Sequence, residues 1–537
     1  MGSFADLAVV GARVRTLDSR CPRATAVAIR AGTIVAVGDD AEVREGCDAK
    51  TRIVDARGGA VVPGLVDAHQ HPFWGAEASQ GADLSGLTTL EEVRRALAAE
   101  RARRRDGWVQ GFGLDYNVFG ETQMDGRLIE DAVGGGPALV TCVDFHTYLA
   151  TPRALEISGV TGPRKLEGNA KIVCRNGTPT GELREIPAAE IVRDAIPEPN
   201  EGERHGWYVE ALRRQNAAGI TGIHMMDGSP GTHEVLRRLE AEGDLTARVV
   251  APFWIKPTTT AEEMQDLLPL RDERGRLWRA GVAKFFIDGV IDTGTAWLDE
   301  PDAMGDGTEP FWPDPAAYRE SVALFAGAGF QVVTHAIGDR AVRHALDAYR
   351  AAGAAPGVRH RVEHAETLKD GELGRFARER VTASMQPLHM QWLRADMSDS
   401  WSRRLGPERA ARGFRIKDLL TSGATVAFGS DWPVAHYDPR PGMAWARLRR
   451  APGERDAEPL TPDGRLSGLE ALEGYATGAA LAVGEEDASG IVKSGFRADL
   501  TAFAGDPVEC DPDELPELPV VMTVVGGQIV FGGAGGV

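Results

Sequence analysis

Cysteine and long apolar runs are scarce in this sequence. Its five cysteines are widely spaced and form no CxxC pair, which argues against a disulfide scaffold or a zinc knuckle and favours a reducing compartment. No basic stretch followed by an apolar one marks the N-terminus as a signal peptide. No run approaches the about 18 apolar residues of a membrane span. We therefore expect a cytoplasmic protein without a membrane partner.

An excess of basic charge is also lacking. Acidic side chains outnumber basic ones by 79 to 60, which gives a net charge of -19. A phosphate backbone requires a basic face, so we expect no nucleic-acid partner. The 537 residues suffice for one large and one smaller domain without help from disulfides or oligomer formation. The oligomeric state, a homo-oligomer included, stays open.

The two ends of the chain share a β-rich character. Short runs rich in Val and Ile occupy residues 7–14, 26–30 and 33–37 near the N-terminus, and 499–503, 520–525 and 528–531 near the C-terminus. These patterns are typical of strands joined by tight turns. They predict one small β-domain assembled from both termini, with two unrelated edge hairpins as the alternative.

The middle of the chain alternates short apolar runs with amphipathic stretches. This alternation is typical of strand–helix units on a parallel sheet, and in a β/α barrel the chemistry lies at the carboxyl ends of the strands. The apolar runs are residues 60–66, 138–143, 219–224, 249–255, 283–287, 330–333, 358–362 and 424–428. The segment from 73 to about 214 exceeds what two plain units need and predicts an insertion.

Two histidines follow the first of these runs. The segment Val61-Val62-Pro63-Gly64-Leu65-Val66-Asp67-Ala68-His69-Gln70-His71 places His69 and His71 at i and i+2, which point the same way on an extended chain. Two imidazoles on one side can bind one divalent ion, for which Zn²⁺ is a suitable candidate. An isolated HxH is often incidental, so the interpretation depends on the other strand ends.

Metal-capable side chains follow three more runs. His335 ends the run at 331–335, His364 ends the run at 361–364, and Asp431 follows the run at 424–428 after a Gly-Ser turn. Each has an ordinary explanation when taken alone, such as a helix-capping aspartate. Their recurrence in the same position of successive units favours one shared metal site.

A lysine lies inside a fifth run. Lys284, in Ala283-Lys284-Phe285-Phe286-Ile287, would be costly as an isolated buried ammonium. An ion pair, a substrate contact and carbamylation by CO₂ are three ways to resolve that cost. Chemistry alone leaves all three open.

Taken together, these segments resemble the amidohydrolase superfamily. PGLVDAHQH, VAKFFIDG, VVTHAIGD, RVEHAE, MQPLHM and FGSDWPV carry the resemblance, which extends over essentially the whole chain. Within the superfamily, the chain is most similar to the amidohydrolase-3 group, which includes N-substituted formamide deformylases. The resemblance implies a distorted (β/α)₈ TIM barrel at 63–484 with an insertion. It also implies a small β-sandwich domain built from residues 1–62 and 485–537.

The resemblance also implies the ligands. His69 and His71 would come from barrel strand 1, Lys284 from strand 4, His335 from strand 5, His364 from strand 6 and Asp431 from strand 8. A carbamylated Lys284 would bridge two ions, one held with His335 and His364 and the other with His69, His71 and Asp431. A single-ion site, with His364 orienting the water, is the alternative.

The implied activity is hydrolysis of a C–N bond in a small amide-type substrate, whether amide, N-formyl or N-acyl, by metal-activated hydroxide. Asp431 would accept the proton of the water and return it to the leaving nitrogen. Gln386, His389 and Trp432 are candidate substrate contacts, with a structural role as the alternative. A deaminase or cyclic-amide hydrolase on the same barrel is one competing hypothesis. A regulatory or binding protein on the same scaffold is another.

Overall fold

A parallel barrel sheet lies at the centre of the molecule. The computed structural model describes residues 4–103, 107–120, 122–143, 145, 147–166, 170–184 and 186–533. Its largest sheet has eight strands in the order β21-β20-β19-β18-β17-β16-β15-β8, and every pairing between neighbours is parallel. The strands are β8 (Leu65–Gln70), β15 (Ile220–Met225), β16 (Arg248–Trp254), β17 (Trp278–Phe286), β18 (Gln331–Ala336), β19 (Arg361–His364), β20 (Thr382–Met385) and β21 (Val426–Phe428).

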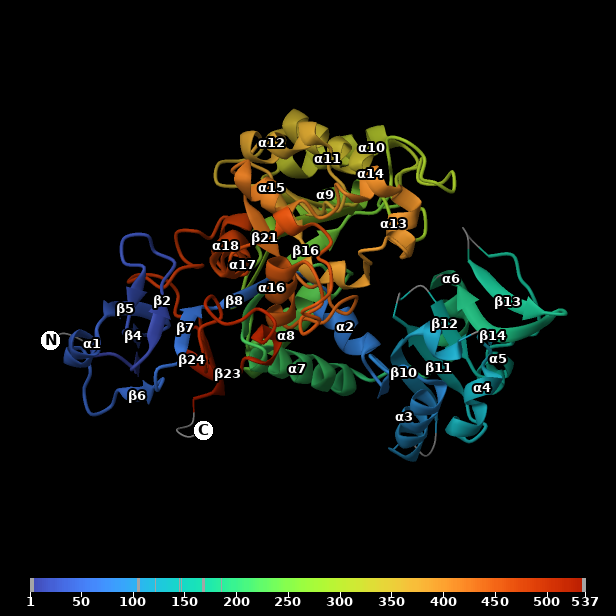
Figure 1. The fold of residues 1–537 in the computed structure, drawn as a ribbon, viewed down its shortest axis with the longest axis horizontal. Coiled ribbons are helices and arrows are strands. Elements are labelled where there is room, and N and C mark those ends of the chain that lie inside the picture. The colour runs from blue at the N-terminus through green and yellow to red at the C-terminus, as the bar shows by residue number, and fades with distance from the viewer. Residues whose placement is uncertain are drawn as a thin grey trace. The chain divides into compact units, whose positions relative to one another are not determined.

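Helices follow the strands and cover the outside of this sheet (Figure 1). Phe285 of β17 meets Phe325 of α10 with ring centroids 6.1 Å apart, and burial of one such ring contributes about 1.5–3 kcal/mol. The helices between consecutive strands are α8 (Thr232–Glu242), α9 (Ala261–Leu267), α10 (Pro315–Gly327), α11 (Asp339–Ala352), α12 (Asp370–Arg378), α13 (Ser400–Leu405), α14 (Pro407–Ala410) and α15 (Ile416–Thr421). After β21 come α16 (Pro439–Leu448), α17 (Gly468–Gly474) and α18 (Thr477–Ala482).

The barrel closes where β8 meets the loop after β21. The backbone N–H of Asp431 donates to the carbonyl of His69 at 2.7 Å, and the N–H of His71 donates to the carbonyl of Trp432 at 2.9 Å. Gly429 makes the approach feasible, because a Cβ at this position would lie 2.4 Å from the backbone nitrogen of His69. Closure therefore brings the HxH pair and Asp431 side by side.

Both ends of the chain contribute to two further sheets. One has the order β5-β4-β1-β6 and the other β24-β23-β22-β7-β2-β3. Their strands are β1 (Leu7–Val10), β2 (Arg13–Arg15), β3 (Arg23–Ala24), β4 (Ala26–Arg30), β5 (Thr33–Gly38), β6 (Arg52–Asp55), β7 (Ala60–Pro63), β22 (Leu500–Phe503), β23 (Val520–Val525) and β24 (Gln528–Gly532), with α1 (Asp40–Glu45) beside them. One buried apolar cluster joins Leu7, Val9 and Ile29 of the first sheet to Leu500 and Val524 of the second.

These sheets confirm the expected fold class, a distorted (β/α)₈ barrel with a β-sandwich to which both termini contribute. Residues 1–72 and 209–537 form one compact unit. Division of this unit at 62/63 and 484/485 stays a prediction.

Residues 73–208 form a second compact unit. Its sheet has the order β13-β14-β12-β11-β10-β9, and the apolar run at 138–143 becomes β11 of this sheet instead of a barrel strand. The reason is its pairing with β10 and β12. The strands are β9 (Ala82–Asp83), β10 (Val109–Leu114), β11 (Ala138–Cys142), β12 (Thr147–Ala150), β13 (Lys171–Arg175) and β14 (Thr178–Arg184); the α-helices are α2 (Pro72–Ala78), α3 (Leu90–Arg103), α4 (Arg127–Glu130), α5 (Pro152–Ile157), α6 (Ile186–Arg193) and α7 (Glu201–Ala217), of which α2 begins and α7 ends in the first unit.

Candidate metal centre

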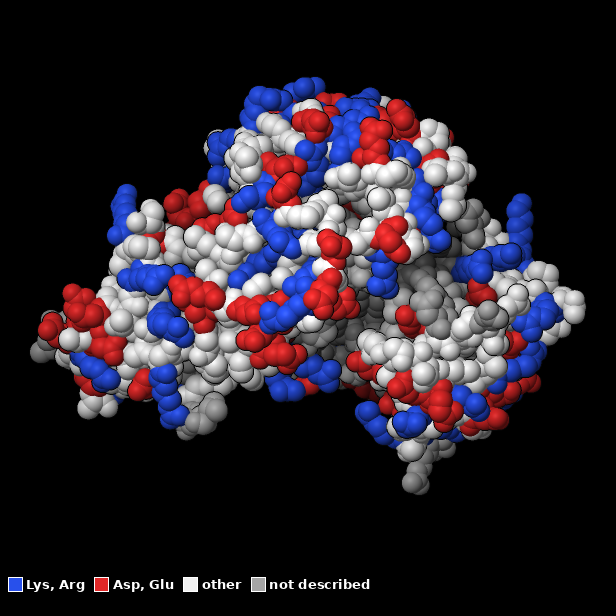
Figure 2. Space-filling view, in the orientation of Figure 1, with Lys and Arg blue, Asp and Glu red and all other residues white. Residues whose placement is uncertain are grey.

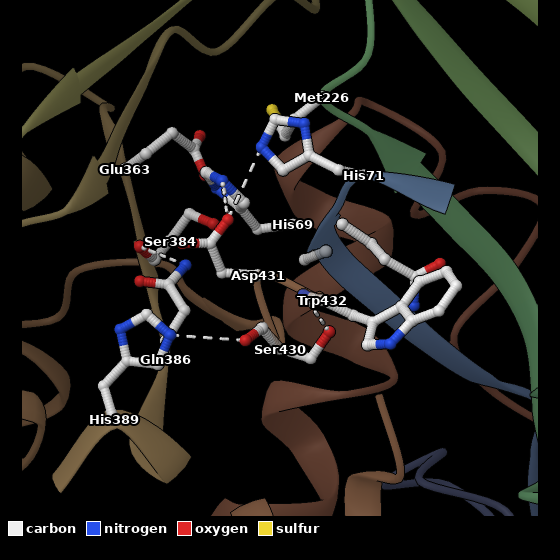
Figure 3. A network of polar contacts seen from close by, with 12 residues as sticks. His69, His71, Met226, Glu363, Ser384, Gln386, His389, Ser430, Asp431 and Trp432 are labelled. Carbon is white, nitrogen blue, oxygen red and sulfur yellow. Dashed lines mark hydrogen bonds and ion pairs between the residues drawn. The ribbon is translucent and has the colours of Figure 1, made fainter. Parts of the chain in front are cut away.

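The strand ends bring two histidines and an aspartate together inside the barrel (Figure 3). The Nε2 atom of His69 lies 3.2 Å from Oδ1 of Asp431, and Nε2 of His71 lies 3.5 Å from the same oxygen. All three side chains are buried. The i, i+2 spacing on β8 thus directs both imidazoles to one carboxylate.

Each of these imidazoles also contacts a carboxylate of its own through Nδ1. Nδ1 of His69 lies 2.6 Å from Oε2 of Glu363, and Nδ1 of His71 lies 3.1 Å from Oδ1 of Asp227. A carboxylate at Nδ1 fixes the ring orientation and favours the tautomer with Nδ1–H, so that Nε2 is a bare donor atom for a metal. Both Nε2 atoms then face Asp431.

His364 completes a compact set of donors. Among the described residues, ligand atoms of His69, His364 and Asp431 all lie within 4.8 Å of one another. His364 and Asp431 adopt left-handed backbone conformations, with φ of 71° and 59°. Such conformations cost free energy in residues other than glycine and are found where a side chain must be aimed into a site.

Lys284 and His335 lie beside this set. The side chain of Lys284 is buried, and within the described chain its Nζ has no hydrogen-bond partner; it lies 5.0 Å from the ring centroid of Phe286. The ring of His335 is 4.4 Å from that of His364, but its Nε2 faces the carbonyl of Gly289 at 3.1 Å. His335 therefore lies next to the site with its Nε2 at a backbone carbonyl, and its role as a metal ligand stays a prediction.

The candidate substrate contacts lie on the neighbouring loops (Figure 3). His389 is 3.3 Å from the carbonyl of Ser430 through Nε2, and Nε2 of Gln386 lies 3.5 Å from the carbonyl of Ser384. Trp432 packs edge-on against Tyr437, with centroids 5.4 Å apart. All three predicted side chains are buried, and their role toward a substrate stays a prediction.

Burial and charge set the protonation of these groups. Burial raises the pKa of Asp431, but the adjacent His69, His364 and His71 together outweigh it and leave the pKa well below its usual range. Burial lowers the pKa of Lys284 to about 8 and that of His335 to about 3. An ionised carboxylate is the state in which Asp431 can bind a cation.

The residues present fit a divalent ion. Imidazole nitrogen and carboxylate oxygen are the donors that Zn²⁺ accepts. At this site, the buried Nδ1 of His364 and Nζ of Lys284 have no hydrogen-bond partner among the described residues. An unpaired buried polar atom calls for an explanation, which a bound ion can supply.

A family comparison covers most of the chain. The model of the amidohydrolase family matches residues 52–531. The chain belongs to the amidohydrolase family. Membership supports the assignment of this protein as a hydrolase.

Three similar proteins cover nearly all of this amidohydrolase. Protein LONG AFTER FAR-RED 3 of Arabidopsis thaliana is 29% identical over 99% of this chain and 92% of its own length. N-substituted formamide deformylase of Arthrobacter pascens is 28% identical over 99% of each chain. The crystal structure of an uncharacterised metal-dependent hydrolase from Pyrococcus furiosus is 26% identical, with a TM-score of 0.72, over 94% of this chain and 100% of that one.

Sequence reasoning missed the groups behind the ligands, Glu363, Arg361 and Asp227. A signal for the first two existed: Arg361 and Glu363 alternate on an apolar strand, and charges on one face of a buried strand must pair. Asp227 follows the run at 219–224 just as the predicted ligands follow theirs. What the sequence did not reveal is which of these polar groups face the ion and which support a neighbour.

Proposed function

We propose that this amidohydrolase uses a divalent ion, with zinc as the first candidate, to hydrolyse a C–N bond of a small amide-type substrate, whether amide, N-formyl or N-acyl. The observation that carries the proposal is the convergence of His69, His364 and Asp431 within 4.8 Å. The barrel family and the name of the deformylase relative support the same chemistry.

Asp431 has the position and charge of the general base. An ion bound here would act as a Lewis acid, making water more acidic and a carbonyl more electrophilic. With its pKa held below the usual range, the Asp431 carboxylate is ionised at neutral pH. It accepts a proton from the attacking water and returns it to the leaving nitrogen.

Lys284 is the proposed bridge between two ions. Reaction of its neutral amine with CO₂ forms an N–C bond, releases a proton and yields a carbamate. This carbamate would bind one ion with His335 and His364 and another with His69, His71 and Asp431. Its burial and its Nζ without a described hydrogen-bond partner support this assignment. A single-ion site, with His364 orienting the water, is the alternative.

The remaining parts of the proposal concern the surroundings of the site. Gln386, His389 and Trp432 would contact the substrate. A cytoplasmic location fits the five free cysteines. In the described part of the chain, no helix combines the length and apolarity of a membrane crossing.

Two competing functions predict different results. A deaminase or cyclic-amide hydrolase would act on a ring substrate and would not need Lys284 as a ligand. A non-catalytic regulatory protein on this scaffold would have no need of an ionised carboxylate facing two carboxylate-backed imidazoles. The observed pairs of His69 with Glu363 and His71 with Asp227 therefore favour a catalyst.

Metal analysis combined with a hydrolysis screen tests the proposal. Metal-replete protein prepared in bicarbonate should hold one or two divalent ions per chain and should release an amine from at least one N-formyl or N-acyl substrate. His69→Asn should lose both properties, whereas His344→Asn, on the outer helix α11, should keep them. Wild-type protein that binds no divalent ion would refute the proposal, and turnover of cyclic amides or aminated rings alone would favour the competing enzyme.

A further inference from the structure

An arginine lies at the centre of the barrel, behind the candidate ligands. Arg361 of β19 is 1% exposed. Its Nε donates to Oε1 of Glu363 at 2.9 Å, and its Nη2 donates to Oε2 at 3.0 Å. The same guanidinium donates to the carbonyl of Ala68 at 2.6 Å and to the Ser384 hydroxyl at 3.0 Å, and Nη1 lies 3.0 Å from Nδ1 of His224.

These contacts join four barrel strands. Ala68 belongs to β8, His224 to β15, Glu363 to β19 itself and Ser384 to β20. A buried guanidinium without partners would be strongly destabilising, and full use of its donors is what makes burial tolerable. Packing alone would be served at lower cost by an apolar side chain of similar volume. The presence of a charged guanidinium at this position therefore needs a functional explanation.

The second contact of the Glu363 carboxylate, with His69, indicates this role. Its Oε2 accepts from Arg361 and lies 2.6 Å from Nδ1 of His69. Because the guanidinium is planar and bonds both oxygens, it fixes the plane and rotation of the carboxylate. The carboxylate in turn determines where the Nδ1–H bond of His69 points, and hence where Nε2 points.

We propose that Arg361 is a positioning residue for the metal centre: through Glu363 it holds His69 in the Nδ1–H tautomer with Nε2 directed at Asp431. The proposal rests on the proposed function only in requiring that an ion bind at His69. Part of the metal affinity then depends on Arg361, a residue that does not touch the ion.

A zinc titration with a matched pair of variants tests this proposal. Arg361→Lys keeps the charge but replaces the fork by a single rotatable donor group. Arg375→Lys makes the same change at a buried arginine that bonds both oxygens of Glu379, at 2.7 and 3.2 Å, on outer helix α12. Zinc affinity, measured by competition with a chelating indicator, should fall about 10–100-fold in Arg361→Lys and stay at the wild-type value in Arg375→Lys.

Two further readouts separate positioning from general damage. Thermal unfolding of the metal-free proteins should show that both lysine variants are folded at the temperature of the titration. Nitrogen NMR of labelled histidine should show one tautomer for His69 in metal-free wild type and a mixture in Arg361→Lys. An unchanged affinity in Arg361→Lys, or equal losses in both variants, would overturn the proposal.

Glu363→Asp keeps the inference testable if Arg361→Lys does not fold. The shorter carboxylate can still pair with Arg361 but withdraws from His69, so zinc affinity should fall while the protein remains folded. Wild-type affinity in folded Glu363→Asp would overturn the inference. If wild type itself binds no zinc, the proposed function fails instead, which keeps the two failures distinguishable.

Discussion

Lys284 combines an amine with a position that water does not reach. Burial lowers its pKa to about 8, so the neutral amine should rise from about a tenth of the population at pH 7 to about nine tenths at pH 9. Only the neutral amine reacts with CO₂. We predict that ¹³C-bicarbonate gives a carbamate signal in metal-free protein that grows through this pH range, as measured by carbon NMR.

The control for this experiment is Lys284→Arg. Its guanidinium stays protonated at every pH in the range, so the signal should be absent. A carbamate signal of equal size in this variant would assign the modification to another amine. No pH-dependent signal in wild type would leave the single-ion arrangement as the better description.

Asp431 allows a test that separates chemistry from folding. Asp431→Asn keeps the side-chain volume but removes the charge and the basic oxygen, so the kcat of the hydrolysis found in the screen should fall about 10²–10⁴-fold. Asp438→Asn is the control, because Asp438 lies on the same loop and caps α16 through its side chain, a role that asparagine also performs. Equal kcat values for wild type and Asp431→Asn would remove Asp431 from the mechanism.

At the scale of elements, the site depends on how closely β8 approaches the end of β21. Gly429→Ala would place a Cβ 2.4 Å from the backbone nitrogen of His69, and backbone cannot move aside as a flexible side chain does. We predict that this variant binds zinc at least tenfold more weakly (about 1.4 kcal/mol or more) and unfolds at a lower temperature.

Gly371→Ala is the matched control, since a Cβ at this position of α12 would meet no atom within 4 Å. Alanine has the higher helix propensity, so its stability should equal or exceed that of wild type. Zinc binding by Gly429→Ala at the wild-type level would show that the loop after β21 can shift without disturbing His69.

The elements also show what the sequence could and could not predict. Apolar runs correctly indicated the strand that contains Lys284 and the strands that carry or precede His69, His335 and Asp431, because strand periodicity and the position of polar ends are local properties. The run at 138–143 has the same local character, yet it pairs within the second unit. Nothing in its own residues specifies its partner strand.

Site geometry was predictable only in part for a related reason. The left-handed backbone at His364 and Asp431 departs from the regular strand alternation on which the prediction of side-chain direction depends. The supporting role of Glu363 arises from a contact with His69 that spans 294 residues of sequence. Such contacts are set by barrel closure, which no local pattern encodes.

At the scale of the whole molecule, acidic side chains outnumber basic ones. Basic and acidic side chains are interspersed over the face in view, without a basic field of the kind that binds nucleic acid (Figure 2). With a net charge of -19, we expect a small-molecule substrate instead of a polyanionic partner.

The strands from the C-terminus connect the β-sandwich to the barrel. Leu500 of β22 and Val524 of β23 belong to the sandwich core, whereas Thr501 and Thr523 lie on the opposite face of these strands. The Thr501 hydroxyl donates to the carbonyl of Gly219 at 2.7 Å, and the Thr523 hydroxyl donates to the carbonyl of Asn216 at 2.7 Å. The Asn216 carbonyl lies in the last turn of α7 and the Gly219 carbonyl directly precedes β15, so these two bonds connect the sandwich to the start of that barrel strand.

These two hydroxyls lead to a prediction about cooperativity. Thr501→Val and Thr523→Val keep the shape and β-branching but leave a buried carbonyl without its donor, which costs about 1–3 kcal/mol each. Both bonds connect the sandwich to the barrel. Their loss should therefore weaken the contact between sandwich and barrel more than it destabilises the hydrophobic core of either. Hydrogen exchange should then show lower protection in β15 and in β22–β23, with β18–β19 unchanged. Thr421→Val, which removes an exposed hydroxyl bond to the Lys417 carbonyl within α15, should alter none of these strands. Uniform loss of protection throughout the barrel would instead mean that sandwich and barrel unfold as one body whose stability these bonds share.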